Sequence, residues 1–146
     1  MTSTFRSIAL VGILVVVAGA HEASAQIDNA LEFTTSFQFT VGNTTLPAGS
    51  YTITPVEDDP QLLELRGAHA SVLFLTESAQ PTTLPAKDEV VFSRLGNRYI
   101  LRNIWTAGSN VGYVTENALG ERRLAKHGGT AGESRVAARK TARRTK

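Results

Sequence analysis

The sequence predicts an all-β domain, an antiparallel sandwich or small barrel of about six to eight short strands. Apolar and polar residues alternate along residues 31–41, and two apolar segments flank the dipeptide Gly96-Asn97. Turn residues separate short apolar segments at intervals of roughly ten residues, the spacing typical of antiparallel all-β domains. No segment before Glu116 shows a helical period, so an α/β architecture is not expected.

Residues 31–41 predict a single strand with one buried and one wet face, because side chains alternate between faces along a strand. One parity is apolar and consists of Leu31, Phe33, Phe37, Phe39 and Val41. The residues between them are polar. Further short strands are expected from Tyr51 and at residues 62–66, 71–76 and 111–115, and residues 77–89 are expected to form a loop.

Residues 90–95 and 98–105 predict a β-hairpin, because a two-residue loop containing glycine joins them. This loop places Leu95 opposite Arg98, and Phe92 opposite Leu101. The face expected to enter the core then consists of Val90, Phe92, Tyr99, Leu101 and Trp105.

The N-terminus has the features of a signal peptide. Arg6 gives a positive start, residues 8–18 form an apolar run, and Ala23-Ser24-Ala25 fits the cleavage pattern. We expect residues 1–25 to form a signal helix that is removed after Ala25, with export to the periplasm or beyond. The alternative is an uncleaved anchor, but the run is short of the about 20 residues that a span needs. After cleavage the protein would not be an integral membrane protein.

The rest of the chain divides by charge. Residues 26–121, the expected β domain, contain 5 basic and 11 acidic residues, whereas residues 122–146 contain 9 basic residues and 1 acidic residue. The chain has no cysteine. An exported domain without disulfides must be held together by its apolar core alone.

The basic segment 122–146 is expected to be a disordered tail, because it has too few large apolar residues to offset chain entropy. Its cations suggest contact with an anionic envelope polymer or lipid, and no specific nucleic acid is predicted. If the segment formed a helix, several of these basic side chains would lie on one face. The expected contact residues are Arg135, Arg139, Lys140, Arg143, Arg144 and Lys146. The alternatives are a tail that only aids solubility and a tail that folds back onto the acidic body.

No catalytic, metal or cofactor site is predicted. His69 and His127 are isolated, and a metal site needs several converging ligands. No serine is placed beside a base by sequence. The aromatic hairpin side chains form either core or a small-ligand pocket, and this set comprises Phe37, Phe39, Phe92, Tyr99, Leu101 and Trp105.

The stretches FTVGNTTLPAGSYTI (residues 39–53) and EVVFSRLGNRYILRNIW (residues 89–105) resemble a set of small exported bacterial proteins without a characterised function. The resemblance covers about residues 31–116, implies a β fold and export, and brings no active residue. The segment LPAGSY also resembles the strand-opening turns of carboxypeptidase-regulatory-like and other immunoglobulin-like sandwich domains.

The sequence therefore predicts an exported, non-enzymatic β domain with a binding or structural role at the cell envelope. The main alternative is a carrier of a small, lipid-like ligand with a pocket inside the domain. An enzyme is disfavoured because the sequence indicates no set of polar residues that would meet in a cleft. An outer-membrane barrel is disfavoured because its strands need about 9–11 residues each.

Overall fold

The computed structural model describes residues 30–116 and 132–141. These residues contain ten strands: β1 (Ala30–Thr35), β2 (Phe39–Val41), β3 (Thr44–Leu46), β4 (Gly49–Val56), β5 (Asp59–Arg66), β6 (Ser71–Ala79), β7 (Glu89–Leu95), β8 (Arg98–Trp105), β9 (Gly112–Thr115) and β10 (Gly132–Thr141). The described ranges hold no helix long and apolar enough to cross a bilayer. The expected signal peptide and its cleavage point after Ala25 lie outside these ranges.

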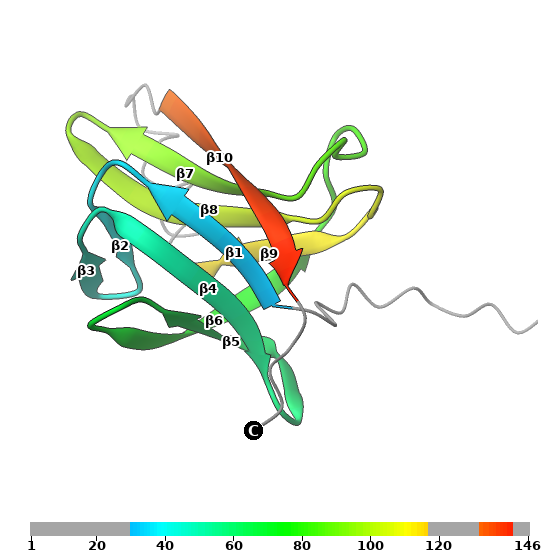
Figure 1. Cartoon of the computed structure of the whole chain (residues 1–146). Coiled ribbons are helices and arrows are strands. Elements are labelled where there is room, and N and C mark those ends of the chain that lie inside the picture. The colour runs from blue at the N-terminus through cyan, green and yellow to red at the C-terminus, as the bar shows by residue number, and fades with distance from the viewer. Residues whose placement is uncertain (1–29, 117–131, 142–146) are drawn as a thin grey trace, which may run out of the picture.

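Eight strands close into an antiparallel barrel (Figure 1). Their order around the wall is β8-β7-β10-β1-β4-β5-β6-β9, and pairing of β9 with β8 closes the ring. The all-β prediction is confirmed, and of its two architectures the small barrel is the one that forms. Closure removes the exposed strand edges that an open sheet would leave.

The strand expected at residues 31–41 is broken into two. Strand β1 belongs to the barrel wall, whereas β2 pairs with β3 and lies parallel to β8 through Thr40 and Ile100. At the break, the Thr35 hydroxyl donates a hydrogen bond to the Phe37 carbonyl over 2.8 Å. The alternation still places the apolar parity of both pieces inward, which is why one continuous strand was predicted.

The β7–β8 hairpin has the predicted register near its turn, with Leu95 opposite Arg98 and Phe92 opposite Leu101. Gly96 takes a φ of 61° in that turn. The register then shifts, so that Val91 faces Asn103 and Arg102 is the extra residue of a bulge. A bulge reverses the inward parity of the residues that follow it.

The bulge corrects the prediction for Trp105. Beyond Arg102, the side chain that enters the core is Ile104, which is 1% exposed. Trp105 pairs with Glu89 on the outer face of the wall. Trp105 is therefore not part of the barrel core, although the four other residues of that predicted face do lie against or within it.

Aromatic side chains fill the barrel interior around Phe92. The ring of Phe92 lies 5.1 Å from that of Phe39 and 6.2 Å from that of Phe33, measured between centroids. At the margin, half-buried Phe37 stacks on Tyr99 at 3.9 Å. The buried core comprises Leu31, Phe33, Phe39, Val41, Leu46, Tyr51, Ile53, Leu63, Leu65, Phe74, Val90, Phe92, Leu101, Ile104 and Tyr113.

Residues 132–141 correct the prediction of a disordered tail. They form β10, which pairs with β1 on one side and β7 on the other. Val136 and Ala138 face inward and pack against the core, whereas Arg135 and Arg139 point outward. The segment needs little apolar surface of its own, because two neighbouring strands satisfy its backbone and supply the core. Residues 132–141 are also not helical, so they do not form the basic face that a helix would have given them.

Candidate functional site

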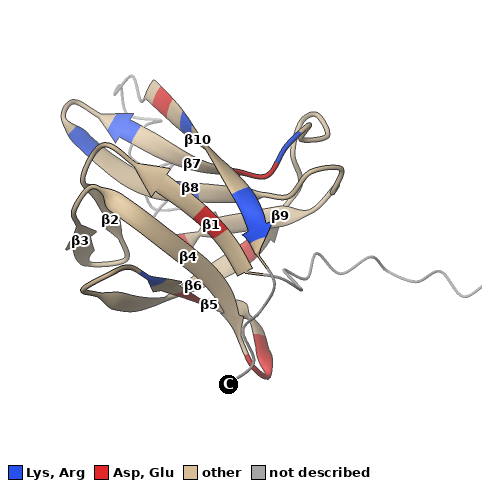
Figure 2. Cartoon of the chain, in the orientation of Figure 1, with Lys and Arg blue, Asp and Glu red and all other residues tan. Residues whose placement is uncertain are grey.

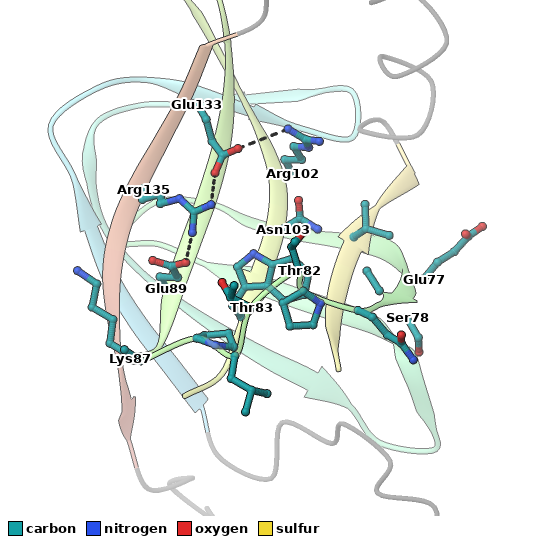
Figure 3. Close-up of a pocket in the computed structure, with 18 residues that line it drawn as sticks. Glu77, Ser78, Thr82, Thr83, Lys87, Glu89, Arg102, Asn103, Glu133 and Arg135 are labelled. Atoms are coloured by element: carbon teal, nitrogen blue, oxygen red, sulfur yellow. Dashed lines mark hydrogen bonds and ion pairs between the residues drawn. The ribbon is translucent and has the colours of Figure 1, made fainter. Parts of the chain in front are cut away.

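A cavity of about 680 Å³ lies on the outside of the barrel, under the loop of residues 80–88 (Figure 3). This loop joins β6 to β7, which are separated in the wall by β9 and β8, so the chain must cross both strands. Strand residues lining the cavity, such as Glu89 and Val114, alternate with core residues such as Val90 and Tyr113. The cavity is thus formed between the crossing loop and the outer face of the wall.

The crossing loop is attached at its β7 end. The Asp88 carboxylate accepts a hydrogen bond from the Ala107 N–H over 2.9 Å, and the Asp88 carbonyl accepts one from Ala138. The Pro85 carbonyl accepts a third from the Gly108 N–H over 2.9 Å. These bonds tie the loop both to the β8–β9 turn and to β10.

A network of four charged side chains forms one wall of the cavity. Arg135 on β10 contacts Glu89 on β7 and Glu133 on β10, each over 2.5 Å, and Arg102 lies 3.7 Å from Glu133. Figure 3 shows the four side chains in a continuous chain of contacts across three neighbouring strands. Partial burial alone would lower the pKa of Arg135, but the adjacent carboxylates of Glu133 and Glu89 raise it above the ordinary value. Arg135 is therefore permanently charged.

Two buried side chains at the cavity each have one oxygen atom with no donor among the described residues. Glu89 is 7% exposed, and only its Oε1 atom receives a hydrogen bond, from Arg135. Asn103 is 6% exposed and donates through Nδ2 to the Tyr113 carbonyl over 3.3 Å, which leaves Oδ1 free. Buried acceptors without partners are costly, so these two atoms favour a bound donor.

Trp105 borders the same cavity, and a close approach to Gly112 positions it. A Cβ atom added to Gly112 would lie 2.2 Å from Cε3 of the indole and 2.6 Å from the Ile104 carbonyl oxygen. A larger residue at this position would displace the ring. Glycine is therefore required here for space and not for its backbone angles.

We expect Gly112→Ala to destabilise the protein by about 1–3 kcal/mol, the usual cost of overpacking. It should also move the fluorescence maximum of Trp105, because the indole must leave its position. Gly132→Ala is the matched control, since its added Cβ would make only an ordinary 3.7 Å contact. Denaturant titration with fluorescence detection measures both effects. An unchanged emission spectrum in Gly112→Ala would contradict this packing.

The structure disperses the residues predicted to contact a polyanion. Arg135 and Arg139 each pair with carboxylates of the body, the latter with Glu32 over 2.9 Å, and Lys140 is exposed on β10. Figure 2 shows this basic strand beside the acidic residue of β1. Arg143, Arg144 and Lys146 lie outside the described residues. For 132–141, the arrangement matches the alternative in which the basic segment folds back onto the acidic body.

The residues predicted as core or pocket also separate. Phe39, Phe92 and Leu101 are buried in the barrel, and Phe37 and Tyr99 stack at its margin. Only Trp105 of that set, together with Arg135 of the basic set, borders the outer cavity. Glu89 and Asn103 were not identified from the sequence as lining residues of a cavity. The one signal for Glu89 was its position next to inward-facing Val90 in the predicted hairpin, which places its side chain on the outer face.

The described residues contain no group of three or more His, Asp or Glu side chains gathered to hold a metal ion. The chain matches no protein-family model, no curated protein and no solved structure. Any function must therefore be argued from the geometry of the chain itself.

Proposed function

We propose that the protein is an exported, non-enzymatic binding domain that takes a small ligand into the cavity under residues 80–88. The observation that carries this proposal is the buried side chain of Glu89, one oxygen of which has no donor among residues 30–116 and 132–141. The volume of about 680 Å³ falls within the range of small-molecule sites. Its lining is mainly polar, with apolar surface from residues such as Leu84 and Trp105.

Binding is favoured over catalysis because four of the six charged side chains of the cavity, Glu89, Arg102, Glu133 and Arg135, are fixed in one network of ion pairs. Among the described lining residues, the hydroxyls of Ser78, Thr82 and Thr83 have no basic partner that would activate a nucleophile. The network fixes side chains in position, which is what a binding site requires.

The proposal moves the ligand from the barrel interior to its outer face. A lipid-like ligand inside the barrel would have to displace Phe39 and Phe92, which are 1% and 0% exposed and contact each other. The outer cavity needs no such rearrangement. An interior carrier is therefore the weaker candidate.

Export and a place at the cell envelope are part of the proposal. They are supported by the sequence of residues 1–25, with cleavage after Ala25. We also propose that the chain belongs with the small exported bacterial proteins that it resembles. In this setting, the basic residues beyond β10 would add attraction to anionic polymers or lipids.

Native mass spectrometry of the protein purified from its exported fraction tests the proposal. We expect a chain that begins at Gln26 and carries a discrete additional mass. Ala79→Phe, which adds a ring to the cavity lining, should abolish that mass. Ala68→Phe, in the β5–β6 turn, is the matched control and should retain it. A bare chain mass, or an added mass that Ala79→Phe retains, would contradict the proposal.

A further inference from the structure

We infer that the ligand of the outer cavity is a neutral saccharide, held by its hydroxyl groups against Glu89, Asn103 and Trp105. The inference rests on the proposed function and names the ligand class for the same cavity. Three properties of the lining carry it: its charge balance, its mixture of free donors and acceptors, and an indole at its edge.

The charges of the lining cancel. Its acidic residues are Glu77, Glu89 and Glu133, and its basic residues are Lys87, Arg102 and Arg135. An anion entering the cavity would meet the free oxygen of Glu89, and a cation would meet Arg135 and Arg102. With no net field to attract an ion of either sign, the cavity favours an uncharged ligand.

The free hydrogen-bonding groups at the cavity are of both kinds. Glu89 Oε2 and Asn103 Oδ1 accept, and no described residue donates to either of them. The N–H groups of Arg102 donate, because its contact with Glu133 at 3.7 Å is too long for a hydrogen bond. A hydroxyl group both donates and accepts, so adjacent hydroxyls on one ring can satisfy both kinds of partner.

The crossing loop adds further hydroxyls of the protein. Thr82 and Thr83 line the cavity from the crossing loop, and both are labelled in Figure 3. Their hydroxyls have no protein partner among the described residues. A polyhydroxylated ring between wall and loop would therefore find donors and acceptors on two sides.

Trp105 supplies the apolar surface that a sugar ring also needs. A pyranose presents hydroxyls around its rim and C–H groups on its faces, and an aromatic ring suits such amphipathic surfaces. The indole Nε1 of Trp105 has no described partner and is a further donor. An apolar ring beside rigid polar groups distinguishes this site from one for a purely ionic ligand.

Trp105 is the only tryptophan of the chain, so its fluorescence reports on the site directly. The experiment titrates the full mature protein with maltotriose, cellotriose and chitotriose, and separately with spermidine and inositol hexaphosphate. We expect a saturable change with at least one trisaccharide and none with either ion. Loss of a hydrogen bond to a charged group weakens binding roughly tenfold or more, which is the effect expected for Glu89→Gln.

Glu64→Gln, the same substitution on the opposite wall, is the matched control and should bind as the parent does. Because Glu89→Gln also removes an ion pair, the double variant Thr82→Ala/Thr83→Ala on the exposed loop provides a second test and should weaken binding severalfold.

The inference would be overturned if none of the three trisaccharides changed the Trp105 fluorescence. It would also be overturned if Glu89→Gln and the threonine variant bound as tightly as the parent. A response to spermidine or inositol hexaphosphate alone would overturn the ligand class while leaving the cavity as a binding site. The added mass seen by native mass spectrometry decides the proposed function independently of this outcome.

Discussion

Deleting residues 132–146 should unfold the barrel, although the sequence predicts that they belong to a disordered basic tail. Strand β10 is bonded to β1 and β7 along most of its length, and nothing else in the described chain joins those two strands. Its removal opens the ring, exposes core residues such as Phe33 and Phe92, and leaves two unpaired edges. A typical domain has only about 5–15 kcal/mol of stability, which this loss should exceed.

Circular dichroism during heating measures the effect. The parent should show a cooperative transition, and the deletion variant should show none. A shorter deletion of residues 142–146 is the control, because it removes none of the contacts described for β10. If the longer deletion melted at the temperature of the parent, β10 would not close the barrel.

Replacing Phe92 by alanine should cost about 3–5 kcal/mol, the range measured for aromatic residues in packed cores. Phe92 is 0% exposed, and its ring contacts those of Phe33, Phe37 and Phe39. The cavity left behind would remove contacts from all three neighbours. Urea titration measures the change in the free energy of unfolding.

The control for Phe92 is Leu73→Ala on the outer face of β6, where the side chain is 61% exposed. Its expected cost is below about 0.5 kcal/mol. Equal effects of the two substitutions would show that the aromatic cluster does not organise the core.

Local patterns in the sequence were sufficient to predict many of the inward-facing residues and the main hairpin of the barrel. The alternation around Leu31 and Phe39 identified the inward residues, and the Gly96 turn fixed the register of the β7–β8 hairpin near its loop. Both features depend on neighbours in the chain. The bulge at Arg102 has no signal in the local alternation of residues 98–105, and it turned Trp105 from the core to the outer face.

Strand β10 shows why composition alone failed for the C-terminal segment. Val136 is its only large apolar residue, so the segment could not fold by itself. Its order comes from β1 and β7, which lie far away in the sequence and provide backbone partners and a core. The opposite charges of body and tail did indicate contact between them, because Arg135 pairs with Glu89 and Arg139 pairs with Glu32.

The candidate site was beyond prediction for the same reason. Glu89 and Arg135 are 46 residues apart and meet only because β10 lies beside β7. The cavity exists because the loop of residues 80–88 must cross β8 and β9, which follows from the strand order and from no local motif.

Hydrogen–deuterium exchange at residues 132–141 of the mature protein tests the central claim most directly, because both barrel closure and the charged wall of the cavity depend on β10. The amides of this segment should be protected to the same degree as those of β1 and β7, since all three strands open only when the barrel does. Exchange within seconds at neutral pH, with β1 and β7 still protected, would show that the barrel closes without β10 and that Arg135 does not hold Glu89.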